Sequence, residues 1–244
     1  MLLPVAVLLA LACLPFFLLP TTLAFLDGKR TRWLVALCNL LPLAGFAMHL
    51  IGAAGALIAW LVVLHFALRP TPPTAADLDE DIELLPYDPH WPGSFAAERA
   101  RLVAGLGLSR EAIEHIGSTA VPGLAAKPVV DMMLGVSALP PTRDLLSRLG
   151  ILGYQNLGEA DVPGRWYLRL RGEQAVNLHV VERDGPHWTN NLALRELLRR
   201  DPDARERYAR GKQAALETGG PRLLAYSAAK APVVNELLAA AQAR

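Results

Sequence analysis

Apolar residues fill the first 68 positions of the chain almost without interruption, and the pattern changes completely after them. The residues with a formal charge in this region are Asp27, Lys29, Arg30 and Arg32. The stretch Leu2–Leu26 is long enough to cross a hydrocarbon core, which takes about 20 apolar residues. A second run, Trp33–Leu68, exceeds one span, so either two short spans turn near His49 or one tilted helix follows an interfacial piece. We therefore expect two or three transmembrane helices in residues 1–68.

Basic residues predict the orientation of this region, because positive charges in short loops remain on the cytoplasmic side. Lys29, Arg30 and Arg32 place the loop between the two apolar runs inside. Three spans, or a turn within the bilayer, return the rest of the chain to the same side. We expect the bacterial inner membrane as location, the lipid bilayer as partner of residues 1–68, and a cytoplasmic globular domain. The basic turn and Asn39 also resemble, loosely, small superinfection-immunity-type membrane proteins, and this likeness would imply immunity or transport by the segment.

A Pro-rich and then acidic stretch separates the apolar region from an ordinary globular sequence. Prolines between Arg69 and Thr74 favour an extended chain, and acidic residues cluster between Asp77 and Asp81. We predict a linker over residues 69–81 and a globular domain over residues 82–244.

The globular domain shows strand patterns mixed with helix patterns, followed by helix patterns alone. Alternating or continuous apolar runs predict strands at Ile82–Leu85, Pro128–Val136, Arg165–Leu170 and Ala175–Val181, and a short run before the second of these ends in His115-Ile116-Gly117-Ser118. Helical periodicity predicts helices from an N-cap at Ser94 to Gly105 or Gly107, from a cap at Thr142 to Gly150, and at Asn190–Arg200, Asp203–Thr218 and Ala231–Ala243. This order indicates an α+β fold with a mixed sheet and C-terminal helices.

Composition excludes one class of partner. The net charge is +1, and acidic residues are interspersed with basic ones, so we expect no basic face for a long nucleic acid. Cys13 and Cys38 both lie in the apolar region, where cysteine behaves as a small hydrophobe, and we expect neither a disulfide nor a zinc site. The composition points to no particular protein partner.

The segment from Ile113 to Asp131 is the most distinctive motif of the chain. It reads Ile-Glu-His-Ile-Gly-Ser-Thr-Ala-Val-Pro-Gly-Leu-Ala-Ala-Lys-Pro-Val-Val-Asp. It resembles the signature of the GrpB family, and the resemblance extends over about residues 82–240. Residues outside the motif that fit are the Tyr-Asp-Pro-His-Trp-Pro run from Tyr87, the Asn-Leu-His-Val run from Asn177, Arg195, Tyr208, Lys212, Tyr226 and Lys230. The resemblance implies a nucleotidyltransferase-like fold.

That fold implies roles for the motif residues. In nucleotidyltransferases a Gly-Ser turn after a strand holds the nucleotide phosphates, and nearby carboxylates hold divalent metal. Glycine lets backbone N–H groups approach an anion closely, and the serine hydroxyl adds a donor. The resemblance implies Asp131, with His115 or His179, as metal ligands, and Asp131, Ser118 and His179 as catalytic residues. The implied ligand-binding residues are Gly117, Ser118, Thr119, Lys127, Arg165, Lys212 and Lys230.

The pattern of the residues alone also permits structural roles. A histidine flanked by apolar strand residues, such as His115 or His179, is typical of a core position. Lys127 at a strand entrance and the helical Lys212 and Lys230 have the pattern of surface residues. Arg165 alternates with apolar neighbours, which indicates either a solvent-exposed strand face or a groove whose basic side chains bind anions.

One position departs from the nucleotidyltransferase pattern. The residue two after Asp131, on the same strand face, is Met133 rather than an acid. One carboxylate and one histidine make a poor site for two magnesium ions, because magnesium prefers oxygen ligands. The first hypothesis is a membrane-tethered, nucleotidyltransferase-like enzyme that acts on a nucleotide or phosphorylated small molecule, with magnesium or manganese as cofactor and a nucleoside triphosphate as substrate. The second is a catalytically degenerate nucleotide-binding module anchored at the membrane.

Overall fold

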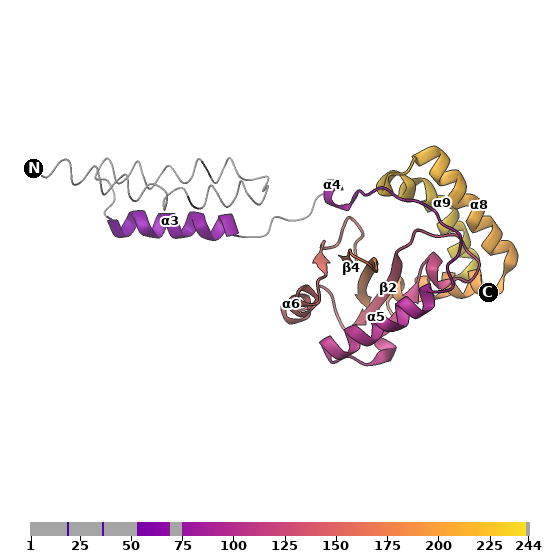
Figure 1. Ribbon diagram of the computed structural model, residues 1–244, viewed down its shortest axis with the longest axis horizontal. Coiled ribbons are helices and arrows are strands. Elements are labelled where there is room, and N and C mark those ends of the chain that lie inside the picture. Colours follow the sequence, from indigo (N-terminus) through magenta and orange to yellow (C-terminus); the bar gives the residue numbers. More distant parts are fainter. Residues whose placement is uncertain (1–18, 20–35, 37–52, 69–74, 243–244) are drawn as a thin grey trace, which may run out of the picture. The chain divides into compact units, whose positions relative to one another are not determined.

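The computed structural model describes residues 19, 36, 53–68 and 75–242. Backbone contacts divide the chain into two compact units, Met1–Pro72 and Pro73–Arg244. The second unit contains the sheet and all the candidate site residues (Figure 1).

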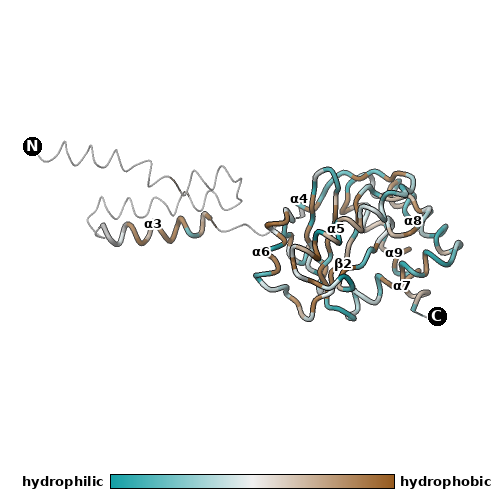
Figure 2. The backbone as a smooth tube through the Cα atoms, turned by 60° about the horizontal axis from the view of Figure 1, so that its bottom comes forward, coloured by the Kyte–Doolittle hydropathy of each residue, from teal (hydrophilic) through white to brown (hydrophobic). Residues whose placement is uncertain are grey.

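The described part of the first unit is mainly one apolar helix, α3 (Ala53–Leu68), which Figure 2 colours largely as hydrophobic. Across the described residues, no helix has both the length and the apolarity needed to cross a bilayer.

The expected transmembrane segment is corrected by this finding, and so is the inner-membrane location that we derived from it. The apolarity of Trp33–Leu68 suggested one or two spans, but α3, the helix described within that run, does not meet the requirements for a span. The predicted span Leu2–Leu26, the basic loop at residues 29–32 and the turn near His49 fall almost wholly outside the described residues.

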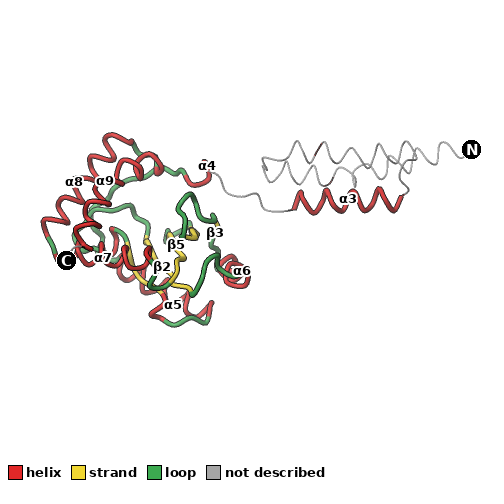
Figure 3. The backbone as a smooth tube through the Cα atoms, turned by 180° about the vertical axis from the view of Figure 1, so that it is seen from behind, coloured by secondary structure: helices red, strands yellow, loops and turns green. Residues whose placement is uncertain are grey.

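The second unit is built on a mixed five-stranded sheet (Figure 3). Its strands are β1 (Ile113–Ile116), β2 (Val130–Val136), β3 (Gln155–Asn156), β4 (Arg165–Leu170) and β5 (Val176–Glu182). They lie in the order β1-β2-β5-β4-β3, with β2 and β5 parallel and the other pairs antiparallel. The α+β class and the mixed sheet are therefore confirmed.

One face of the sheet forms the main hydrophobic core. Alternate residues of the two central strands are fully buried there, for example Met132 and Leu134 on β2 and Leu178 and Val180 on β5. The helices α5 (Trp91–Leu106) and α6 (Arg143–Ile151) contribute to this core. The opposite face carries the residues in between, which include Asp131, Met133 and their β5 neighbours Asn177 and His179.

Three C-terminal helices complete the unit: α7 (Pro186–Arg200), α8 (Pro202–Gly219) and α9 (Leu223–Gln242). Trp188 of α7 packs against Met133, Ile116 and Val181 on the second face of the sheet. A further core cluster joins the three helices to Val121 and Leu124, which follow β1. This packing holds α8 and α9 beside the turn at the end of β1.

Several predicted boundaries are confirmed and several are wrong. Strand β4 has the predicted bounds, and the Thr142 side chain caps α6 by accepting a hydrogen bond from the Leu145 N–H at 3.2 Å. Helix α5 ends at the left-handed Gly107 as expected, but it begins at Trp91 with a proline in its first turn, so Ser94 is not its cap. The predicted strand Ile82–Leu85 is wrong, because this segment makes one isolated bridge, between Leu85 and Ala126.

Candidate functional site

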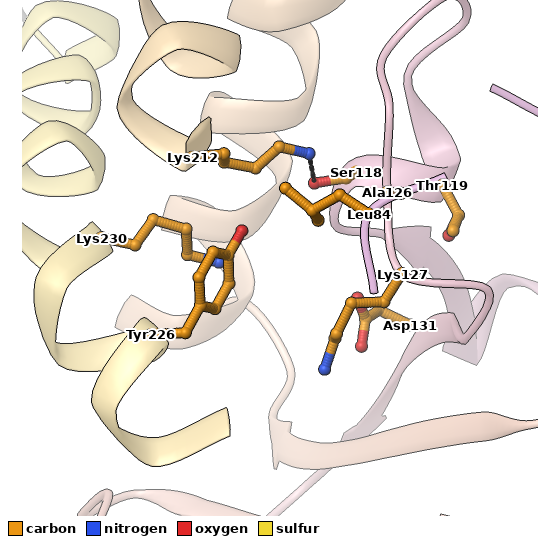
Figure 4. Close-up of a pocket in the computed structure, with 9 residues that line it drawn as sticks. All are labelled: Leu84, Ser118, Thr119, Ala126, Lys127, Asp131, Lys212, Tyr226 and Lys230. Atoms are coloured by element: carbon orange, nitrogen blue, oxygen red, sulfur yellow. Dashed lines mark hydrogen bonds between the residues drawn. The ribbon is translucent and has the colours of Figure 1, made fainter. Parts of the chain in front are cut away.

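A pocket opens between the end of β1, the start of β2 and the helices α8 and α9 (Figure 4). Lysines reach it from both sides: Lys212 and Lys230 come from the helices, and Lys127 comes from the segment before β2. The residues that line it are Leu84, Ser118, Thr119, Ala126, Lys127, Asp131, Lys212, Tyr226 and Lys230. The structure thus brings together five of the predicted ligand-binding residues and the predicted metal ligand Asp131.

The floor of the pocket depends on a glycine. Gly117 follows β1 with φ +70°, and the 3-10 turn η2 (Ser118–Ala120) follows it. A Cβ atom at Gly117 would lie 2.5 Å from Oδ2 of Asp131, far inside van der Waals contact. Glycine is therefore required both by the backbone angle and by the close approach of the carboxylate. The turn and Asp131 form one unit, as the motif implied.

Asp131 is held by neighbours on its own face of the sheet. Asn177 lies opposite it on β5 and donates from Nδ2 to Oδ1 of Asp131 at 2.8 Å, while Nε2 of His179 lies 3.7 Å from the same oxygen. Burial by itself would raise the pKa of the Asp131 carboxyl, but His179, Lys127 and Asn177 outweigh it and hold that pKa well below its usual range. Asp131 is therefore ionised at neutral pH.

The position where a second acid was sought is part of the core. Met133 is fully buried against Trp188 and its cluster beneath α7, which leaves no room for a hydrated ion. Among the described residues, no group of three or more His, Cys, Asp and Glu side chains is placed to hold a metal ion. The donor set around Asp131 does not fit a two-metal centre.

The two candidate histidines lie on different faces of the sheet. His115 stacks on Phe95 at 4.6 Å between ring centroids, and its Nε2 lies 3.0 Å from Oγ1 of Thr119. Burial lowers the pKa of His115 to about 4, so it is neutral. His179 does share the face of Asp131, and burial also lowers its pKa despite the nearby carboxylate. His115 is thus placed as a support for the turn, whereas His179 is the histidine with a nitrogen 3.7 Å from the Asp131 carboxylate.

Lys212 is the most buried of the pocket lysines, with a relative exposure of 2%. Its Nζ donates to Oγ of Ser118 at 3.1 Å and to the Ala125 carbonyl, so it ties α8 to the turn after β1. Burial, and then repulsion from Lys230, lowers the pKa of Lys212 to about 7. The ammonium is partly deprotonated near neutral pH.

The other two lysines that line the pocket are Lys230 and Lys127. Lys230 lies over the ring of Tyr226 at 5.3 Å, and both residues project from α9 toward the pocket (Figure 4). Lys127 stands near Asp131, yet burial lowers the pKa of its ammonium group below the usual value. Among the described lining residues, Asp131 is the only acid against these three amines.

Two predicted ligand-binding residues do not line the pocket: Gly117, which lies behind it against Asp131, and Arg165, which makes other contacts. The Nη2 atom of Arg165 donates to the Ala160 carbonyl at 3.2 Å, and its guanidinium lies 5.1 Å from the ring of Tyr167.

Sequence reasoning in turn missed a role for Tyr226, although the spacing to Lys230 places both on one helical face. It also missed Asn177, which the alternation of β5 places beside His179.

Comparison with known proteins identifies the second unit. The family model described as GrpB protein matches residues 81–240. A UPF0157 protein of Streptomyces coelicolor is 36% identical over 154 residues, which are 63% of this chain and 81% of that protein. A crystal structure of conserved protein GrpB from Enterococcus faecalis superposes with a TM-score of 0.54 and 29% identity, covering 64% of this chain and 97% of that chain.

A relative with a named activity matches over part of its length. A dephospho-CoA kinase of Mycolicibacterium paratuberculosis is 29% identical over 177 residues, which are 62% of this chain and 44% of that enzyme. This chain thus spans less than half of the kinase. With the family model covering residues 81–240 and the motif from Ile113 to Asp131 forming the pocket floor, the chain belongs to the GrpB family.

Proposed function

We propose that the pocket binds a phosphorylated small molecule, with a nucleotide as the first candidate. One observation carries the proposal. The sequence has four lysines against twenty arginines, and the three lysines within the described residues, Lys127, Lys212 and Lys230, all line this one pocket. Within the described residues, the other basic side chains are arginines and histidines, and the lysine ammonium groups are gathered in one place.

The energetics support an anion as the missing partner. Burying a cation without a paired anion is unfavourable, and Asp131 can neutralise only one of the three amines. A phosphate group offers several acceptor oxygens, and ammonium groups donate to phosphate as compact point charges. The Ser118 hydroxyl, already bonded to Lys212, adds a further donor. Phosphate binding would offset the cost of the buried charges.

Binding without nucleotidyl transfer is the function that the geometry supports best. The lowered pKa of Asp131 makes it a poor base, and the lining residues that the structure describes include no second carboxylate for a metal pair. The nucleotidyltransferase-like enzyme remains the second hypothesis, favoured by the close contact of the Gly117 turn with an ionised carboxylate. In that case Asp131 would be a single protein ligand to a magnesium or manganese ion, which would supply charge neutralisation at the phosphates.

Calorimetric titration of the full chain with ATP, AMP and pyrophosphate, with and without magnesium, tests the proposal. We expect saturable binding that Lys230→Gln weakens at least about tenfold, because a charge-assisted contact to phosphate is lost. Arg200→Gln removes the same charge from an exposed position and should leave affinity unchanged. Equal weakening by both variants, or no binding at all, would contradict the proposal. Release of pyrophosphate from ATP would favour the enzyme instead.

A further inference from the structure

A short acidic segment, residues 78–82, runs beside the polar face of the sheet. Leu78 packs against Leu157 and Tyr167 at the β4 side. At the other end, the Ile82 N–H donates to the Pro221 carbonyl at 2.7 Å. In Figure 1 the chain passes from α4 (Ala75–Leu78) toward α8 and α9 along this route. We call residues 78–82 the strap.

The strap places one carboxylate against two arginines of the sheet. Glu80 accepts hydrogen bonds from Nε and Nη2 of Arg171 at 3.1 and 2.8 Å, and Nη1 of Arg169 lies 3.9 Å away. Two parallel bonds from one guanidinium are the geometry in which arginine holds a carboxylate or a phosphate. Glu80 therefore occupies a position that suits an external anion.

The neighbouring acids of the strap face elsewhere. Asp79 and Asp81 both pair with Arg222, at 3.0 and 3.2 Å, and Asp79 also accepts from the Leu224 N–H. These contacts fix the backbone of the strap without using Glu80. The Glu80 side chain can therefore leave its arginines while the strap stays anchored.

The arginine pair is connected to the lysine pocket by two hydrogen bonds. Nη2 of Arg171 donates to Oδ1 of Asn177 at 3.0 Å, and Asn177 in turn donates to Asp131, which lines the pocket. The hydroxyl of Tyr167 donates to the same Asn177 oxygen at 2.7 Å. The two cationic groups are thus joined by one hydrogen-bond network through the buried Asn177.

We propose that Arg169 and Arg171 form a second anion-binding subsite beside the lysine pocket, and that Glu80 fills this subsite in the chain without ligand. This inference rests on the proposed function of the pocket. The ligand class that it specifies is a small molecule with two separate anionic groups, one for the lysines and one for the arginines. Binding of the second group displaces the Glu80 carboxylate, so Glu80 acts as an internal competitor.

The test compares two sugars that differ by one phosphate, fructose 6-phosphate and fructose 1,6-bisphosphate, by calorimetric titration of the full chain. In Glu80→Gln the arginines are no longer neutralised, so affinity for the bisphosphate should rise about tenfold while affinity for the monophosphate stays within about twofold. Glu83→Gln is the matched control, because it removes the same charge from an exposed residue nearby. Arg171→Gln should abolish the preference for the bisphosphate.

The outcomes separate the two proposals. Equal affinities of wild type and Glu80→Gln for the bisphosphate, with both sugars still binding in a Lys230-dependent way, would overturn the second subsite and leave the pocket standing. A rise for both sugars alike, or an equal rise in Glu83→Gln, would show a general charge effect and also overturn it. Absence of binding by every variant would overturn both. Thermal melting of each variant confirms that it is folded.

Discussion

Lys212 combines complete burial with a bond to the turn that forms the pocket floor, so its protonation decides how the pocket treats an anion. Its pKa is about 7, and the groups around it are Lys230, Asp131 and the ring of Tyr208. An anion binds the protonated amine more tightly than the neutral one. Affinity should therefore be highest below pH 7 and fall as the pH rises through 7.

Sulfate is the suitable probe for this prediction, because it does not titrate in the range. We expect its affinity for the full chain to fall about tenfold between pH 6 and pH 8, as measured by calorimetry. In Lys212→Gln the affinity should be weaker and nearly independent of pH across the same interval. An unchanged slope in that variant would assign the titration to another group.

Gly117 gives a second prediction at the residue scale. Gly117→Ala places a Cβ within 2.5 Å of the Asp131 carboxylate and forces a side chain into a positive φ, so we expect a loss of about 3 kcal/mol in the free energy of unfolding. Gly123→Ala is the control, because Gly123 also has a positive φ of +79° but has open space around it. That variant should lose only about 1 kcal/mol. Denaturant unfolding measures both, and equal losses would mean that the contact with Asp131 is unimportant.

At the scale of elements, a strand was predicted correctly where the alternation of apolar residues reflects a sheet, and wrongly where the same alternation has another cause. Strand β4 was predicted with its bounds because alternation along Arg165–Leu170 reflects two real faces of a sheet. The alternation of Ile82–Leu85 has another cause: Ile82 packs on Ala215 and Tyr226, while Leu85 pairs with Ala126 alone. Four residues cannot distinguish these cases.

The C-terminal helix was recognised only in part. Helix α9 begins at Leu223, eight residues before the predicted start, and continues through Pro232. Proline inside a helical pattern normally indicates a boundary, and here packing against α7 and α8 overrides it.

The residues of the candidate site also divide into those that a local sequence pattern predicts and those that it does not. Gly117, Ser118, Thr119, Lys127 and Asp131 could be predicted because one short motif contains them all. Lys212 and Lys230 were found through the family resemblance, since helical periodicity alone indicates surface positions. Their burial depends on α8 and α9 folding back over the turn, which no local pattern encodes. The acid Glu80 was counted as part of a linker for the same reason.

The attachment of α7 to β1 gives a prediction at this scale. Arg195 donates from Nη1 to Oε2 of Glu114 and to the His115 carbonyl, both at 2.8 Å, and so holds the helix against the strand that leads into Gly117. Arg195→Leu leaves both acceptors unpaired, and we expect a loss of about 2 kcal/mol in the free energy of unfolding. Arg200→Leu, at the exposed end of the same helix, should change it by less than about 0.5 kcal/mol. Equal effects would show that the contact adds nothing.

At the scale of the whole molecule, the boundary between the two units lies at Pro72 and Pro73, so the strap belongs to the second unit with the sheet. Leu78 and Ile82 are each 8% exposed, and both pack on elements distant in sequence. The N-terminal part of the second unit is therefore tied to the fold beside the candidate site. This arrangement predicts how far the second unit can be shortened from its N-terminal side.

Three shortened chains, residues 73–244, 79–244 and 83–244, test this dependence by denaturant unfolding. The first retains every strap contact and should unfold cooperatively. The second loses the buried Leu78 side chain and should be about 2 kcal/mol less stable, since burial of a leucine contributes about 1.5–3 kcal/mol. The third also loses Ile82 and the Glu80 contact with Arg171, and we expect a total loss of about 4 kcal/mol. If all three chains unfold at the same denaturant concentration, the strap contributes nothing to the fold. We expect this graded loss of stability because each of the two further shortenings removes one buried side chain, whereas the residues of a linker would not be buried.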